Sequence, residues 1–260
     1  MNAIDVKNLT KKYGVHFAVK DLSFHVRKGT VFGLLGANGA GKSTTIECIL
    51  GTKKMDTGQV SILGMDPIRE RTKVFERTGV QFQESKYQEL IKVKELCEMT
   101  ASVYKKPTDY EALLTEFGIA DKVGTYVKDL SGGERQRLFI VLALIPDPEL
   151  VFLDELTTGL DARARKDVWN ILERLKNQGL SILLTSHFMD EVEALCDEIL
   201  ILKKGHAVFH GTVEEARTES GKQNFEDAYL WYTDEEDRNC LLYTSPSPRD
   251  QVKSRMPSSA

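Results

Sequence analysis

Residues Thr30–Thr44 read TVFGLLGANGAGKST, an apolar run that passes directly into a glycine-rich loop. The run TVFGLLG is typical of a strand buried on both faces of a sheet, and KSTTIECIL after the loop is typical of a helix. Between them, Gly36–Ser43 fits the pattern G-x-x-x-x-G-K-S/T in the strand-to-helix context that the pattern requires. A chance glycine turn would not need that context, so we predict a phosphate-binding loop.

The residue types in this loop suit the binding of a nucleoside triphosphate. Glycines let successive backbone N–H groups converge on an anion without obstruction by Cβ atoms, and the helix N-terminus adds its dipole. Lys42 can place a positive charge near the β- and γ-phosphates, and the Ser43 hydroxyl can bind Mg²⁺. The loop therefore predicts a site for ATP with Mg²⁺.

Strands alternate with helices along the rest of the chain, which predicts an α/β fold around a mostly parallel sheet. The stretch of about residues 84–130 is helical and interrupts this alternation as an inserted subdomain. Residues 198–211 read as a hairpin that turns at Lys204–Gly205. The other expected strands are residues 4–10, 22–26, 58–64, 149–155 and 180–186, and the other expected helices are residues 89–104, 109–120, 133–145, 161–179 and 224–232.

Two acidic residues follow the buried run LVFL at the end of a second expected strand. Ligands of open parallel sheets collect at the carboxyl ends of the strands. Asp154 would there hold Mg²⁺, directly or through water, and Glu155 would polarise the attacking water as a general base. Two solvated carboxylates at a strand end would look the same in isolation, but beside a phosphate loop we favour the catalytic interpretation.

Polar residues at one further strand end and just before the helical insertion are candidates for the same site. His187 follows LSILLTS and is expected to contact the γ-phosphate, although a lone histidine is more often structural. A glutamine in TGVQFQES can touch Mg²⁺ or the water and signal nucleotide occupancy to the helical insertion. Strand alternation places Gln81 and Gln83 on the same face, so their spacing alone does not choose between them.

The octapeptide LSGGERQR, Leu130–Arg137, is a second candidate for anion binding. Ser131 and Glu134 form an S-x-x-E capping box, which an ordinary helix start would also contain. We interpret Ser131, Gly132 and the adjacent helix N-terminus as a cap for a nucleotide. The octapeptide lies on the helical insertion, far from its own phosphate loop, so we expect two copies to pair head to tail and cap each other's ATP.

Composition restricts the other possibilities. The formal net charge of −4 does not favour non-specific nucleic-acid binding. The four cysteines contain no C-x-x-C pair, which argues against zinc or a disulfide framework and fits a reducing compartment. The N-terminus lacks the apolar core of a signal peptide, and the longest apolar run is too short to span a bilayer. Any membrane role is therefore expected to depend on a partner.

Residues 240–260 gather serine and proline after a well-patterned domain, and they could be read as a disordered tail. Written back into codons, Cys240–Asp250 and Ser254–Ala260 match the two ends of a transposase-type sequencing adapter. Gln251–Lys253 would be the variable index between them. We therefore expect residues 1–239 to be the biological domain and residues 240–260 to be translated adapter, with the natural chain continuing differently past about Asn239.

Taken together, these motifs resemble the nucleotide-binding subunit of ABC transporters over about Ile4 to Tyr232. In that family's terms, Gly36–Thr44 matches Walker A, Leu150–Asp154 matches Walker B, and Leu130–Arg137 matches the signature. Gly159–Leu160–Asp161 matches the D-loop, and His187 matches the switch histidine. Spacing in the family selects Gln83 over Gln81. Six motifs in order make the resemblance specific.

The resemblance implies a complete set of site residues. It assigns catalysis to Glu155, His187 and Gln83, and the binding of Mg²⁺ to Ser43, Gln83 and Asp154. Tyr13 matches the aromatic residue that stacks on adenine. The implied nucleotide-binding residues are Tyr13, Gly36, Ala37, Asn38, Gly39, Ala40, Gly41, Lys42, Ser43, Thr44, Ser131, Gly132, Gly133 and Asp161.

The resemblance also implies an architecture and partners. It implies a P-loop NTPase core with an antiparallel β subdomain and an inserted α-helical subdomain. VQFQES, the short insertion and FEDAYL are similar to bacterial drug- or antibiotic-type exporter ATPases. These act as dimers, homo- or heterodimeric, on the cytoplasmic face of the plasma membrane with integral-membrane permease subunits. Leu156 stands where the family usually has proline, and we expect its absence to loosen the D-loop.

Two other functions are alternatives to the exporter hypothesis. A soluble ABC ATPase of DNA repair would carry a long coiled-coil insertion, and one of translation would carry two cassettes in one chain. The insertion here is short and the motifs occur once. A nucleotide-gated binding module that barely hydrolyses ATP would not need Glu155 and His187. We therefore predict an ATP hydrolase that powers transport and binds no nucleic acid.

Overall fold

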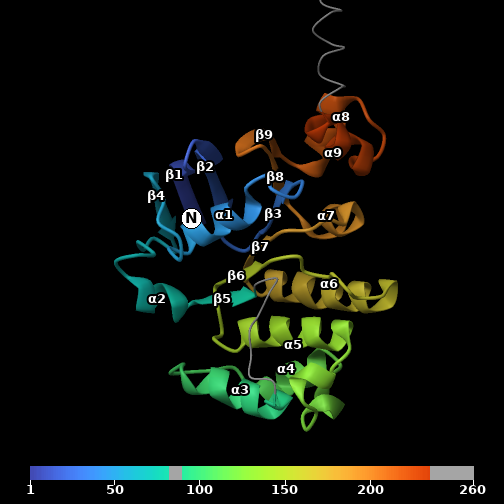
Figure 1. Cartoon of the computed structure of the whole chain (residues 1–260). Helices are drawn as coiled ribbons and strands as arrows, with labels where there is room; N and C mark the ends of the chain where they lie inside the picture. The colour runs from blue at the N-terminus through green and yellow to red at the C-terminus, as the bar shows by residue number, and fades with distance from the viewer. Residues whose placement is uncertain (82–89, 235–260) are drawn as a thin grey trace, which may run out of the picture.

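The computed structural model of the chain describes residues 1–81 and 90–234. Its strands are β1 Asn2–Tyr13, β2 His16–Arg27, β3 Val31–Gly36, β4 Thr57–Ile62, β5 Thr78–Gln81, β6 Leu150–Leu153, β7 Ser181–Leu184, β8 Glu198–Lys203 and β9 His206–Gly211. Within the described residues they form a three-stranded antiparallel sheet, ordered β2-β1-β4, and a six-stranded sheet, ordered β5-β6-β7-β3-β8-β9 (Figure 1). In the larger sheet the pairs are parallel except β8 with β9, as the sequence predicts.

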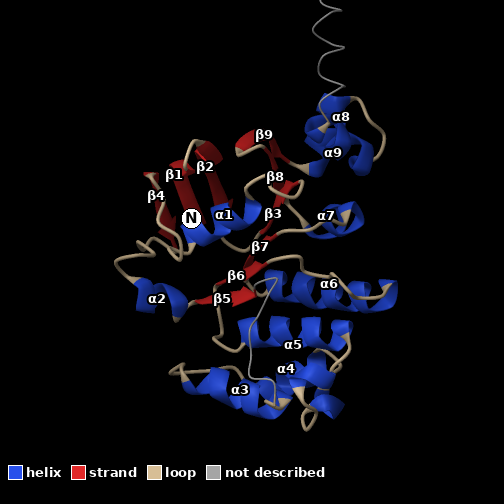
Figure 2. Cartoon of the chain, viewed as in Figure 1, coloured by secondary structure: helices blue, strands red, loops and turns tan. Residues whose placement is uncertain are grey.

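Helices cover these sheets and extend below them (Figure 2). The helices are α1 Lys42–Ile49, α2 Arg71–Phe75, α3 Val93–Ser102, α4 Tyr110–Glu116, α5 Gly132–Leu144, α6 Ala162–Asn177, α7 Met189–Leu195, α8 Val213–Ser220 and α9 Phe225–Thr233, with 3-10 turns at Ala120–Lys122 and Val127–Asp129. Among the described residues, no helix combines the length and apolar character that a membrane crossing requires.

Strand β3 lies in the middle of the larger sheet, between β7 and β8, and every residue from Val31 to Gly36 is buried. Strands β6 and β7 are also buried along their whole length and pair with each other in parallel. Their short apolar runs are therefore strands covered on both faces, as expected. Because neighbouring parallel strands end at the same edge, the loops that follow β3, β6 and β7 open toward one site.

The smaller sheet packs with α1 on one face of the larger sheet. Burial alternates along the second half of β2, where Leu22, Phe24 and Val26 point into the core. They join Ile46 of α1 and Phe32 of β3 in a single apolar cluster. The phosphate loop therefore begins and ends on elements anchored in the same core.

The helical insertion has its own apolar interior, continuous with the opposite face of the larger sheet. Leu96 of α3, Leu114 of α4 and Leu138 of α5 belong to one buried cluster with Val151 of β6. The gap between the expected helices at residues 89–104 and 109–120 falls between α3 and α4, as predicted. The predicted start of the insertion, at about residue 84, lies outside the described residues.

The C-terminal part forms a hairpin followed by short helices. Strands β8 and β9 pair antiparallel and turn at Lys204–Gly205, as predicted. Phe209 of β9 packs with Phe225 and Tyr232 of α9 and with Val192 of α7. The expected adapter residues, 240–260, lie outside the part of the chain that the structure describes.

Four elements do not appear in the sequence pattern: β5, α2, α7 and α8. Strand β5 has four residues, α2 has five and α7 has seven. Segments this short do not show a measurable apolar period. Helix α8 carries a complete capping box, Thr212 with Glu215, which is the signal that would have identified its start.

Candidate functional site

The phosphate loop connects β3 to α1 and folds closely around its own lysine. Gly41 precedes α1 with φ of 109°, and a Cβ there would lie 2.4 Å from the carbonyl oxygen of Ala18, so only glycine fits. Lys42 is buried, and its Nζ donates to the carbonyl oxygens of Gly36 at 2.7 Å and Ala37 at 3.4 Å. The ammonium group therefore lies inside the loop.

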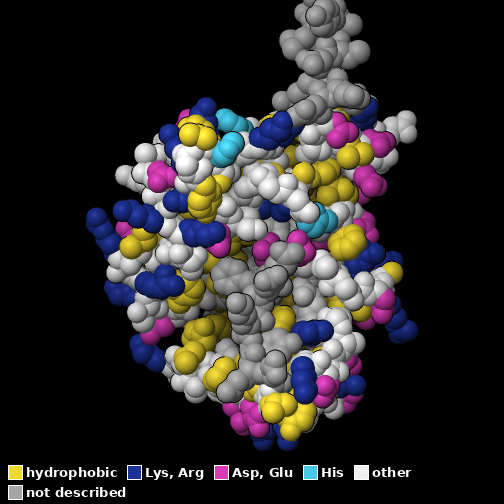
Figure 3. All heavy atoms as spheres, in the orientation of Figure 1, with side chains coloured by type: hydrophobic (Ala, Val, Ile, Leu, Met, Phe, Trp, Pro, Cys, Tyr) yellow, Lys and Arg dark blue, Asp and Glu magenta, His cyan; other side chains and the backbone are white. Residues whose placement is uncertain are grey.

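A cleft of about 370 Å³ opens over this loop, on a face where Figure 3 shows charged and histidine side chains around a hollow. It brings the phosphate loop together with the two acids that follow β6, as expected for strands that end at one edge. Ala18, on β2, is a lining residue that the sequence does not predict. The cleft is lined by Ala18, Asn38, Gly39, Gly41, Lys42, Ser43, Thr44, Asp154 and Glu155.

Two predicted loop residues, Ala37 and Ala40, do not line this cleft. Ala37 and Ala40 line a smaller hollow of about 190 Å³ behind the loop, which they share with Asn38, Gly39 and Thr233, among others. Ala40 is 5% exposed and packs with the cluster beneath the smaller sheet. Ala40 therefore anchors the loop to the core, whereas Ala37 is exposed.

Thr185 holds Asp154 and Glu155 in position through two hydrogen bonds. Its hydroxyl donates to Asp154 Oδ1 at 2.5 Å and accepts from the backbone N–H of Glu155 at 2.9 Å. Thr185 is fully buried and directly follows β7. Its role is not predicted from the sequence, although a polar residue immediately after a buried strand was a usable signal.

Glu155 and His187 meet at the same edge. His187 Nε2 lies 3.2 Å from Glu155 Oε1, and the side chains are 37% and 16% exposed. Glu155 has φ of 53°, a left-handed conformation that is uncommon for a residue other than glycine. Such a conformation persists where surrounding contacts impose it, and it occurs often at functional sites.

Part of that support comes from Gln136, on α5 within the predicted signature. Its Nε2 donates to the carbonyl oxygens of Leu156 at 2.7 Å and Glu155 at 3.2 Å. The Leu156 side chain is fully buried in the same cluster as the helical insertion. Packing and a side-chain hydrogen bond therefore hold the D-loop at the position where we expected the missing proline to loosen it.

Burial and neighbouring charges have opposite effects on the pKa values of the charged groups in the cleft. Burial lowers the pKa of the Lys42 ammonium, while the Asp154 and Glu155 carboxylates raise it. Burial also raises the pKa of Asp154, against the hydrogen bond from Thr185 and the nearby positive groups. A ligand that places negative charge at Lys42 and a cation at Asp154 would relieve both desolvation costs.

The predicted signature residues lie on the N-terminus of α5. Ser131 caps the helix: its hydroxyl accepts from Glu134 N at 3.3 Å, and Glu134 Oε2 accepts from Ser131 N at 2.8 Å. Ser131 and Gly132 are exposed, and a Cβ at Gly133 would lie 3.1 Å from Leu160 Cδ2 in the D-loop. None of the three lines the cleft over the phosphate loop of the same chain.

The other predicted site residues are placed as follows. Asp161 caps α6 by accepting from the N–H groups of Arg163 and Ala164, so it has a structural role whether or not it meets a nucleotide. Tyr13 ends β1, is 48% exposed and does not line the cleft. Gln83 lies outside the described residues, whereas Gln81 is buried at the end of β5.

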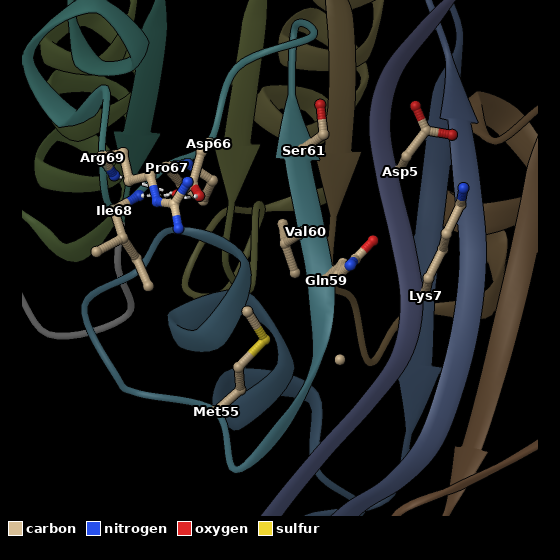
Figure 4. Close-up of a pocket in the computed structure, with 11 residues that line it drawn as sticks. Asp5, Lys7, Met55, Gln59, Val60, Ser61, Asp66, Pro67, Ile68 and Arg69 are labelled. Atoms are coloured by element: carbon tan, nitrogen blue, oxygen red, sulfur yellow. Dashed lines mark hydrogen bonds and ion pairs between the residues drawn. The ribbon is translucent and has the colours of Figure 1, made fainter.

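A larger hollow, of about 550 Å³, lies elsewhere, between β1, β4 and the segment Asp66–Arg69 (Figure 4). Asp66 and Arg69 pair with each other there, with Nε and Oδ2 3.7 Å apart. It contains none of the predicted site residues and does not lie where the parallel strands end. Although this hollow is larger than the cleft over the phosphate loop, we do not consider it the candidate site.

The glycine loop, the buried lysine and the acids at the next strand ends define the class of this protein as a P-loop ATPase. The profile of the family described as "ABC transporter" matches residues 19–158. A solved structure described as "Structure of ATP binding subunit of ABC transporter" superposes with a TM-score of 0.82 at 28% identity, over 89% of this chain and 100% of the other. The predicted fold is therefore confirmed.

Two curated relatives are similar in sequence. "Nod factor export ATP-binding protein I" of Rhizobium meliloti (strain 1021) is 42% identical over 80% of this chain and 64% of its own length. "Daunorubicin resistance ATP-binding protein DrrA3" of Streptomyces coeruleorubidus is 34% identical over 84% of this chain and 71% of its own length. The chain belongs to the ABC transporter family, and it carries the ATPase cassette of that family.

Proposed function

We propose that this chain is the ATP-binding and ATP-hydrolysing subunit of a bacterial ABC exporter. The observation that carries the proposal is the cleft in which Lys42, Asp154 and Glu155 meet, with His187 3.2 Å from Glu155. The relatives named for Nod factor export and daunorubicin resistance support the exporter assignment. The chain would act on the cytoplasmic face of the plasma membrane through a separate integral-membrane permease.

The site residues would have different roles in ATP hydrolysis. Backbone N–H groups of the loop and the Lys42 ammonium would hold the phosphates and stabilise charge that develops on them. Glu155 would accept a proton from the water that attacks the γ-phosphorus, a contribution of about 10²–10⁴-fold. His187, in contact with Glu155, would contact the γ-phosphate and orient the glutamate.

The donor set also fits Mg²⁺. The Ser43 hydroxyl and the Asp154 carboxylate both line the cleft, and oxygen ligands are those that Mg²⁺ prefers. Bound there with a triphosphate, Mg²⁺ would neutralise phosphate charge. Gln83, from the undescribed segment, is the third proposed ligand. Asp154 would be kept in position for this role by the buried hydroxyl of Thr185.

We further propose that two cassettes share each nucleotide. Ser131, Gly132 and Gly133 do not line the cleft of their own chain, yet they present an exposed helix N-terminus. An exposed N-terminus with a serine cap suits an anion. In a head-to-tail pair, each signature would close the cleft of the other copy, with Asp161 and Tyr13 completing the nucleotide contacts.

Isolation from membranes tests the exporter assignment. A tagged chain, expressed in its native host, is expected to copurify with an integral-membrane protein from detergent-solubilised membranes. Inverted vesicles carrying the pair should take up substrate in the presence of ATP, and vesicles carrying Glu155→Gln should not. A chain that hydrolyses ATP but is recovered without any integral-membrane protein would contradict the assignment.

Substitution of the loop lysine tests the phosphate contacts. We expect Lys42→Ala to weaken ATP binding by at least tenfold, because the charge nearest the phosphates is lost. Equilibrium binding of a fluorescent ATP analogue measures the effect. Lys73→Ala is the matched control, since Lys73 is an exposed lysine that pairs with Glu70, and neither residue lines the cleft. Unchanged affinity in Lys42→Ala would count against the phosphate-loop assignment.

A further inference from the structure

A buried carboxyl group lies directly behind the candidate catalytic pair. Glu191, on α7, is fully buried, which is rare for glutamate unless it has partners. Its Oε1 accepts from the Thr157 hydroxyl at 2.7 Å and from Trp169 Nε1 at 2.9 Å. Thr157 is also fully buried, so water does not compete for this contact.

The two donors come from different parts of the chain. Thr157 lies two residues after Glu155, in the segment that leads to the D-loop, and Trp169 lies on α6. Glu191 itself lies four residues after His187, in the helix that continues from the switch-histidine loop. One oxygen atom therefore joins the loop that carries Glu155 to the helix that follows His187.

Hydrogen bonds join the two loops at several points, beginning with Thr185, which lies two residues before His187 and binds Asp154 and the backbone N–H of Glu155. On the cleft side, His187 Nε2 lies 3.2 Å from Glu155 Oε1. Behind the cleft, Thr157 binds Glu191. The bonds of Thr185 hold the segment before His187, and the bond between Thr157 and Glu191 holds the helix after it, so His187 is positioned from both sides. The distance between His187 and Glu155 therefore depends on the buried hydrogen bond.

The pKa of Glu191 and its hydrogen bonds determine which substitutions test its role. Burial raises the pKa of Glu191, while the side chains of Ser186, Thr157 and Trp169 lower it. Both donors bind Oε1, an atom that a glutamine can reproduce as its amide oxygen. Glutamine is therefore a conservative replacement here, and leucine, of similar size, removes the acceptor and leaves two buried donors unpaired.

We propose that Glu191 is a positioning residue for ATP hydrolysis, which holds the segment after Glu155 through Thr157 so that Glu155 and His187 keep their catalytic geometry. It does not line the cleft over the phosphate loop. This inference rests on the proposed function, because it concerns the rate of the ATPase reaction. The proposal gives the two hydrogen bonds to Glu191 different roles. The bond from Thr157 controls the catalytic loop, whereas the bond from Trp169 only anchors α7 to α6.

Kinetics of four single variants test the proposal. Thr157→Val and Glu191→Leu are each expected to lower kcat for ATP about tenfold or more, with KM within threefold, since lost positioning affects the reacting geometry more than binding. Glu191→Gln is expected to stay within threefold of the wild-type kcat. Trp169→Phe removes the other donor to the same oxygen and is the matched control, with kcat expected within threefold.

A spectroscopic measurement separates positioning from stability. The imidazole ¹⁵N shifts of His187 in the nucleotide-free protein are expected to change in Thr157→Val and to match wild type in Trp169→Phe. If both variants lowered kcat equally, or if Thr157→Val retained the wild-type kcat and His187 shifts, the proposal would be wrong even if Glu191→Leu failed to fold. A wild-type chain without ATPase activity would instead refute the proposed function.

Discussion

Glu155→Gln is expected to hydrolyse ATP about 10²–10⁴-fold more slowly than the wild-type chain. The amide keeps the size of the side chain but accepts no proton from the attacking water, so the loss falls on the chemical step. ATP affinity should stay within a few-fold, because the phosphate contacts come from Lys42 and the loop backbone. Steady-state phosphate release measures the rate, and equilibrium binding measures the affinity.

A neighbouring carboxylate supplies the control. Asp190, on α7, is exposed and pairs with Arg165, with Oδ2 and Nη1 3.4 Å apart. Asp190→Asn should hydrolyse ATP at close to the wild-type rate, because surface ion pairs contribute little to stability and this one lies outside the cleft. A Glu155→Gln variant that turned over at the wild-type rate would refute the assignment of Glu155 as the base.

Ser131→Arg is expected to reduce hydrolysis by on the order of 10²-fold or more while each monomer still binds ATP. A bulky cation at the exposed α5 N-terminus would block the approach of a partner's nucleotide. The substitution would also remove the Ser131 hydroxyl, a donor comparable to those of an oxyanion hole. Binding should persist because Ser131 does not line the cleft of its own chain. Phosphate release and monomer binding are measured on the same preparation.

Loss of the helix cap is a separate effect and needs its own control. Removing a serine cap costs about 1 kcal/mol of stability. Ser131→Thr keeps the hydroxyl that accepts from Glu134 N, and it should retain most of the activity. Thermal unfolding of Ser131→Arg shows whether the fold survives. Full activity in a folded Ser131→Arg variant would argue against a shared site.

The sequence predicts most of what positions the site, for a physical reason. Strands β3, β6 and β7 are buried on both faces, so each appears as a continuous apolar run, and the polar residues that follow each run mark the edge of the sheet. The glycine pattern is equally direct, because Gly41 occupies a conformation and a space that exclude a side chain. Motif and burial together locate Lys42, Asp154, Glu155 and His187 at one edge.

The sequence does not predict the contacts that hold these residues in place. Thr185, Gln136 and Glu191 act across chain separations of 19 to 34 residues, through hydrogen bonds that leave no period or motif in the sequence. Leu156 illustrates the same point. Its identity predicts a looser loop than proline would give, whereas its burial and the bond from Gln136 depend on the packing of α5.

If two copies complete each other's reaction centre, turnover must depend on protein concentration, and that dependence is the most direct test of the shared site. ATPase activity per molecule is measured over a dilution series, with the oligomeric state followed by sedimentation under the same conditions with ATP. We predict that turnover per molecule falls as the dimer dissociates. Constant turnover per molecule in a sample that contains only monomers would contradict the shared site.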